Sequence, residues 1–229
     1  MILTTVSIPL VFLLVVIVFI SIAIYSAVNE KKRRNAMQLL ADSLHFRFSA
    51  DKDRHLPKRF HFLEDFGKGN NRYAQNVFTG QANGEAITFF EYHFETTSRD
   101  SEGETTTYHH YFSVFTLSMP RNFPELVVKP EGLFAKLGQA LGFDDIDFES
   151  YEFSKRYEVK SKDKKFAYDF CNGSMIDYLL NKPNLVIEVE NQTLALTHRG
   201  KFSTQTIQHY LNDLQTIRSL MPDYLFSSP

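Results

Sequence analysis

Hydrophobic residues are distributed unevenly along the chain. Residues 1–28 hold 22 hydrophobic residues and no charge, and the first charged side chain is that of Glu30. The stretch from Ile8 to Val28 exceeds the roughly 20 apolar residues that a helix needs to cross a bilayer. Pro9 falls in the first helical turn, where its missing N–H costs little. We therefore predict a transmembrane anchor over residues 1–29 and a separate domain over residues 30–229.

Three alternatives fit this segment less well. A cleaved signal peptide needs a basic region before the apolar run and a small-x-small cleavage site. Here no Lys or Arg precedes the run, and the bulky Tyr25 occupies the cleavage region. A lipoprotein needs a cysteine near the end of the run, whereas Cys171 is the only cysteine. A buried core helix is rarely so uniformly apolar, so the anchor remains the favoured interpretation.

Helical periodicity recurs after the anchor. Helices are expected at residues 30–44, 57–66, 131–141, 163–170, 174–180 and 203–221. In the first of them, the apolar face consists of Ala36, Leu39, Leu40 and Leu44. Asp163 is the expected N-cap of the fourth. The last helix carries one apolar stripe that consists of Ile207, Tyr210, Leu211, Leu214 and Ile217. These helices are expected to pack on a sheet.

Alternating patterns predict the strands of that sheet. Strands are expected at residues 46–48, 73–79, 86–96, 108–117 and 126–129, with an extended stretch at 145–159 and a second hairpin formed by 185–190 and 193–197. The pair Asn83-Gly84 signals a tight turn, and the polar residues 97–106 predict a mobile loop. Because strands occur in hairpin runs, we predict an α+β fold: a single N-terminal transmembrane helix followed by one mainly antiparallel sheet domain with packed helices.

Charge predicts how the anchor is oriented. Lys31, Lys32, Arg33 and Arg34 follow the apolar run directly, and no basic residue precedes it. The positive-inside rule then places the domain in the cytoplasm and the N-terminus outside. The same four charges could attract anionic lipid, but a topology signal is the favoured interpretation. Residues 35–229 hold 21 basic and 26 acidic residues, and this net charge of −5 argues against nucleic acid as a partner.

The histidines on neighbouring strands are the most tempting catalytic or metal-binding candidates. Adjacent strands could bring His93 near His109 or His110, yet His109 and His110 point to opposite faces of their strand and cannot bind one ion together. We favour a half-exposed sheet face over a site, so the sequence predicts no metal and no cofactor. Convergence of two of these side chains would instead favour an enzyme.

Charged runs and the lone cysteine supply weaker candidates. The acidic run 144–152 could hold a cation but reads better as a solvated strand face opposite Ile146 and Phe148. The basic run from Lys155 to Lys165 reads as a partly self-paired surface. Cys171 follows an apolar helix and is expected to pack as a small hydrophobic residue. One cysteine permits no intrachain disulfide and no cysteine-based zinc site.

The block from Asp145 to Leu180 resembles a family of uncharacterised bacterial membrane-anchored proteins that carry a domain of unknown function. The matching positions are Phe153, Tyr157, Val159, Ser161, Asp163, Ala167, Tyr168, Met175, Leu179 and Leu180. Asn172-Gly173-Ser174 departs from the proline-containing linker expected there. The resemblance implies a bacterial source and an α+β domain beside a membrane helix. It transfers no activity and no functional residues.

The sequence therefore predicts a single-pass protein of the inner (cytoplasmic) membrane. No common catalytic motif is present, which favours a non-enzymatic domain that binds another protein or itself at the membrane. A membrane-tethered enzyme of unrecognised class and an anionic-lipid-binding sensor are the alternatives. The sensor would need the basic cluster 31–34 and the run 155–165 to face one plane.

Overall fold

The computed structural model describes residues 8–132, 146–182 and 184–227. The helices are α1 (Ile8–Leu44), α2 (Leu56–Arg59), α3 (Tyr151–Arg156), α4 (Lys164–Phe170), α5 (Gly173–Leu180) and α6 (Thr204–Leu220), with short 3₁₀ turns η1 (Glu64–Gly67) and η2 (Asp223–Leu225). The strands are β1 (Arg47–Ser49), β2 (Asn70–Ala82), β3 (Glu85–Arg99), β4 (Thr105–Pro130), β5 (Tyr157–Ser161) and β6 (Val186–Arg199). The predicted α+β class is confirmed.

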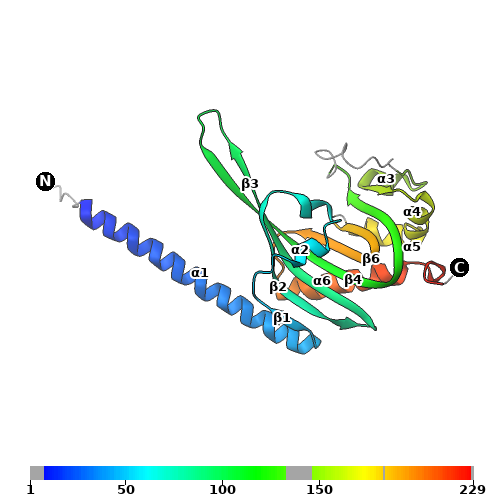
Figure 1. Ribbon diagram of the computed structural model, residues 1–229, viewed down its shortest axis with the longest axis horizontal. Helices are drawn as coiled ribbons and strands as arrows, with labels where there is room; N and C mark the ends of the chain where they lie inside the picture. The colour runs from blue at the N-terminus through cyan, green and yellow to red at the C-terminus, as the bar shows by residue number, and fades with distance from the viewer. Residues whose placement is uncertain (1–7, 133–145, 183, 228–229) are drawn as a thin grey trace.

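Helix α1 is continuous from the apolar segment into the domain and projects from it as a long rod (Figure 1). Its 37 residues span about 55 Å at 1.5 Å per residue. From residue 11 to residue 28 nearly all its side chains are apolar and exposed. By length and composition, this half of the helix could cross a membrane. The domain half buries Met37 and Ala41 completely, whereas Leu39, predicted on the apolar face, is 71% exposed. The buried face is therefore rotated from the predicted one.

One antiparallel sheet forms the centre of the domain. Its order is β1-β2-β3-β4, and β4 then pairs with β5 along its second half and with β6 on its other edge. The β2–β3 turn holds Asn83 and Gly84 at φ 53° and 80°, as the Asn-Gly signal predicted. The β3–β4 hairpin projects beyond the rest of the sheet (Figure 1). Residues 97–106, predicted as a loop, instead continue both strands to a short turn at its tip.

Helices cover both faces of the sheet. On one face, the domain end of α1 and helix α6 enclose a core that includes Ile87, Phe89, Phe115 and Leu117. On the other face, α2 and η1 cover Phe90, Tyr92 and Phe94. This second layer packs Phe60, Leu63 and Phe66, the inward residues predicted for that segment. Because both faces are covered here, residues 89–94 of β3 are buried on both sides.

Three predicted elements differ in the structure. The segments 185–190 and 193–197 do not pair with each other, because β6 is a single strand that pairs with β4 along most of its length and passes Asn191 at φ 52°. The strand predicted at 126–129 is the end of β4, which bends between Ser118 and Leu126 where its register shifts. Part of the extended stretch 145–159 is helix α3, capped by Ser150. The helix predicted at 131–141 lies almost entirely outside the described residues.

Candidate functional site

A buried ion pair joins α1 to the sheet. The Arg33 guanidinium pairs with the carboxylate of Glu91 on β3 and donates from Nη2 to the Phe202 carbonyl oxygen at 2.9 Å. The Glu91 side chain is fully buried, and that of Arg33 is 24% exposed. A buried charge pair holds its geometry only where further hydrogen bonds satisfy it. This pair therefore fixes the end of the anchor helix against one point of the domain.

A bulge in β2 supplies those further hydrogen bonds. Between the pairs Gln75–Glu91 and Phe78–Phe89, two residues of β2 face one residue of β3. The first of the two, Asn76, lies at φ 49°, a conformation that Asn tolerates better than most residues. Its Nδ2 donates to Glu91 Oε2 at 2.8 Å, and Gln75 Nε2 donates to the same oxygen at 3.3 Å. The bulge thus turns an amide onto a buried carboxylate.

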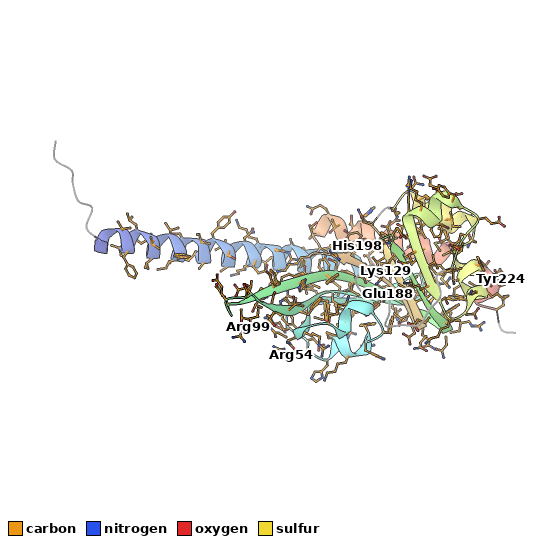
Figure 2. The ribbon with its side chains drawn as sticks, turned by 90° about the horizontal axis from the view of Figure 1, so that it is seen from above. Arg54, Arg99, Lys129, Glu188, His198 and Tyr224 are labelled. Atoms are coloured by element: carbon orange, nitrogen blue, oxygen red, sulfur yellow. The ribbon has the colours of Figure 1, made fainter. Side chains whose placement is uncertain are left out.

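The other residues of the predicted basic cluster remain on the surface. Lys31, Lys32 and Arg34 are exposed, and Arg34 pairs with Glu30 on its own helix, at 3.2 Å. Arg33 is therefore an exception that the sequence could not distinguish. Helices α3 and α4, which carry most of the basic run 155–165, lie at the end of the molecule away from the N-terminus (Figures 1 and 2). This placement counts against the lipid-sensor interpretation.

His93 lies two residues beyond Glu91 on the same face of β3. It is 1% exposed, not half-exposed as predicted, because Tyr73 of β2 stacks on its ring at 4.5 Å and Tyr111 of β4 lies at 4.8 Å. Burial lowers the pKa of His93, which keeps the ring neutral at pH 7. Its Nδ1 faces the Asn71 carbonyl oxygen at 3.2 Å. The ring is therefore held in one orientation and one tautomer.

Two further polar side chains lie close to the second ring nitrogen of His93, Nε2. His93 Nε2 lies 3.1 Å from His109 Nδ1, and Glu95 Oε1 lies 3.4 Å from His109 Nδ1 and 3.8 Å from His93 Nε2. We call His93, Glu95 and His109 the histidine cluster. His109 is 55% exposed at its side chain, so the cluster is open to solvent on one side. Convergence of two histidines is the outcome that the enzyme interpretation required.

His110 is not part of the histidine cluster. Its ring stacks on Phe94 at 4.7 Å, and its Nε2 lies 2.8 Å from Thr96 Oγ1, on the opposite face of the sheet. The prediction that His109 and His110 face opposite sides is therefore confirmed. Glu91 and Glu95 alternate with His93 along β3, but the sequence alone did not indicate either of them as a site residue.

A second polar cluster joins α5, α6 and β6. Asp213 of α6 is 1% exposed and accepts from Tyr178 Oη at 2.7 Å and from Lys182 Nζ at 2.8 Å. Nearby, His198 stacks on Tyr210 at 3.8 Å, and its buried Nε2 has no hydrogen-bond partner among the described residues. The Asp213 contacts tie two helices to each other. His209, whose side chain is 56% exposed, also lies 3.4 Å from Asp213 Oδ2. The contacts of Asp213 with Tyr178 and Lys182 nevertheless indicate a structural role, because they join α5 to α6.

The burial of His198 predicts that the free energy of unfolding falls at acidic pH. Burial lowers its pKa to about 4, whereas an unfolded histidine titrates near about 6.5. Between these values the unfolded chain binds one proton more, so stability falls as the pH falls through this window. We expect His198→Phe to have a shallower dependence than the original protein in urea unfolding from pH 7 to pH 4. The exposed control His61→Gln should keep the original slope, and an unchanged slope in His198→Phe would refute this assignment.

A further charged group lies where the end of β4 meets β5 and β6, and it consists of Lys129, Glu188 and Glu158. Lys129 of β4 is 6% exposed, Glu188 of β6 is 5% exposed, and Glu158 of β5 lies opposite Lys129 in register (Figure 2). Burial lowers the pKa of Lys129, and the two carboxylates oppose that shift. The basic run is partly self-paired, as predicted: Lys160 pairs with Glu158 at 2.6 Å. Arg156 and Lys165 pair with Glu152 and Asp169, just outside the run, at 2.7 and 3.0 Å.

The remaining candidates show no site geometry. Asp147, Glu149 and Glu152 of the acidic run are exposed, and this part is irregular or helical where a strand was predicted. Residues 144 and 145 lie outside the described residues. Cys171 is buried, and burial raises the pKa of its thiol, which agrees with packing as a hydrophobic residue.

No protein-family model matches this chain, and no curated protein matches it either. Among solved structures, the chain is similar to the crystal structure of the mycobacterial trehalose monomycolate transport factor A, TtfA. The two share 16% sequence identity with a TM-score of 0.59, over 83% of this chain and 95% of that one. This likeness shows the fold. The resemblance of residues 145–180 to the bacterial membrane-anchored family stays a prediction.

Proposed function

We propose that this protein is a single-pass, non-enzymatic membrane factor whose cytoplasmic domain docks onto another protein of the inner membrane. The observation that carries the proposal is the rigid junction: α1 runs unbroken into the domain, and Arg33 binds the buried Glu91. A domain on a flexible linker samples many orientations. A domain joined through a helix presents one chosen face to neighbours of the anchor, as a docking factor requires.

The β3–β4 hairpin is the surface best placed for such docking. Beyond the histidine cluster, residues 97–99 pair with residues 105–107 but are exposed on both faces, as is Tyr108. Arg99, near the tip, lies on the side of the domain where the apolar half of α1 leaves it (Figure 2). A two-stranded ribbon alone is marginally stable and has unpaired edges that accept a further strand. Contact with a partner would stabilise the ribbon and pair one of its edges.

The similarity to TtfA supports a factor rather than a catalyst. That protein is described as a transport factor for trehalose monomycolate. An accessory role in moving an envelope component is therefore the kind of process in which we place this chain. At 16% identity the cargo is not carried over. A second candidate, a membrane-tethered enzyme, is favoured only by the convergence of His93 and His109.

Cysteine labelling tests the proposed topology. Cys171 is buried and has a raised thiol pKa, so the original chain should react little with a membrane-impermeant maleimide. We expect Thr4→Cys to be labelled in intact spheroplasts and Ser101→Cys, in the exposed hairpin turn, only after lysis. Labelling of Ser101→Cys in intact spheroplasts would place the domain outside and contradict the proposal.

Site-specific photocrosslinking tests docking. A photoreactive residue at Tyr108, which is 52% exposed on the hairpin, is expected to give a discrete adduct with another membrane protein in native membranes. The matched control is Tyr151, which is 80% exposed on α3, away from the anchor, and should not give this adduct. An absence of adducts from Tyr108, or the same adducts from both positions, would contradict docking through the hairpin.

A further inference from the structure

The histidine cluster has the donor types and spacing of a metal site. The three donor atoms lie within 4.8 Å of one another, with separations of 3.1, 3.4 and 3.8 Å. Zinc binds nitrogen and oxygen donors at about 2.0–2.2 Å in a tetrahedron, which sets neighbouring donors about 3.3–3.6 Å apart. We propose that His93 Nε2, His109 Nδ1 and Glu95 Oε1 bind a divalent transition metal, Zn²⁺ in the first instance.

The surroundings of His93 prepare it for this role. A carbonyl oxygen only accepts hydrogen bonds, so its position 3.2 Å from His93 Nδ1 places the proton on that nitrogen. The lone pair of the neutral ring is then on Nε2, which faces the other two donors. Metal-binding histidines commonly donate their second N–H to a carbonyl in this way. Tyr73 and Tyr111 hold the ring in place from two neighbouring strands.

Asn71 orients a second ligand as well as the first. Its backbone carbonyl faces His93, while its side-chain Nδ2 donates to Glu95 Oε1 at 2.7 Å. It lies at φ 47° beside a register shift in β2, so an irregularity in the strand brings both of its polar groups to the cluster. The residues around the ligands of a metal site commonly orient them through hydrogen bonds, and Asn71 does this for two ligands through two different groups.

Exposure and charge favour a site open on one side. The Glu95 side chain is 22% exposed and that of His109 is 55% exposed, so an ion can enter from solvent, and the fourth position is left to water or to an outside donor. Glu95 supplies one negative charge. The ammonium group of Lys52 lies 4.3 Å from the centroid of the Tyr73 ring, and its positive charge repels a bound cation and limits the affinity of the site. Two imidazoles and one carboxylate favour Zn²⁺ and its transition-metal neighbours over Mg²⁺ or Ca²⁺.

Titration of the full chain with ZnCl₂ tests the site. The protein is purified in detergent micelles without a polyhistidine tag, and binding is measured by isothermal calorimetry and by the visible spectrum of Co²⁺ used in place of Zn²⁺. We expect one saturable site per chain and a tetrahedral Co²⁺ spectrum. His109→Asn and Glu95→Gln, both at partly exposed positions, should each weaken binding by at least about tenfold, because loss of even an outer-shell partner has an effect of that size.

His110→Asn is the matched control. It removes the neighbouring histidine on the opposite face and should leave both the affinity and the Co²⁺ spectrum unchanged. Binding that is absent from the original chain, or that survives unchanged in His109→Asn, would overturn the proposal. So would loss of binding in His110→Asn that equals the loss in His109→Asn. The metal site does not depend on docking, so either proposal can fail without the other.

Discussion

Replacement of Arg33 by methionine is expected to lower the free energy of unfolding of the domain by about 3–5 kcal/mol, the usual cost of leaving a buried charge without its partner. The Glu91 carboxylate is fully buried, and in Arg33→Met its hydrogen-bond donors would be the neutral amides of Asn76 and Gln75. Methionine keeps most of the apolar part of the arginine side chain, so the loss of unfolding free energy measures the effect of removing the charge. Urea unfolding of the full chain in micelles, followed by tyrosine fluorescence because the chain has no Trp, measures it.

The neighbouring arginine provides the control for this experiment. Arg34 is exposed and pairs with Glu30 on the same helix, so Arg34→Met should cost no more than about 0.5 kcal/mol. Glu91→Gln should cost less than Arg33→Met. The new amide could donate to Asn76 Oδ1, which is buried and has no partner in the part of the chain that the structure describes, and Arg33 keeps some contact with water. Equal effects of Arg33→Met and Arg34→Met would show that the ion pair contributes little.

The long apolar helix and the fold class follow directly from the sequence. An uncharged stretch followed by four basic residues is a local pattern, and hairpin turns such as Asn83-Gly84 depend on only two residues. The lengths of β4 and β6 could not be predicted in the same way. Prolines at 120 and 124 suggest a strand end, but the bend in β4 accommodates them where its register shifts. A strand that continues through such a bend is recognised only from its partner.

The candidate sites were predicted less well, because they depend on which elements cover each sheet face. The alternation of Phe90, Tyr92 and Phe94 with polar residues suggested one solvated face. In the structure, α1 and α6 cover the face that carries Phe89 and Glu91, and flanking tyrosines cover His93 there. No local pattern shows that Arg33, a basic residue of α1, will reach a carboxylate 58 positions away.

The same covered face predicts a second large effect, at Phe89. This side chain is fully buried and stacks between Phe78 at 4.4 Å and Phe115 at 5.0 Å. Phe46, which follows α1, and Phe202, which precedes α6, also contact its ring at 5.7 and 5.9 Å. Phe89→Ala removes the ring at the centre of this cluster and should cost about 3–5 kcal/mol.

The cost at Phe89 should also appear as a looser junction between the anchor helix and the sheet. Because Phe46 and Phe202 come from the segments that flank the two covering helices, hydrogen exchange in Phe89→Ala should rise in residues 37–46 as well as in β3. Tyr151→Ala, at an 80% exposed position, is the control and should change stability by less than about 0.5 kcal/mol. If exchange rises in β3 while residues 37–46 stay protected, then the aromatic cluster stabilises only the sheet, and α1 is held to the domain by its other contacts, the Arg33–Glu91 pair and the buried Met37 and Ala41.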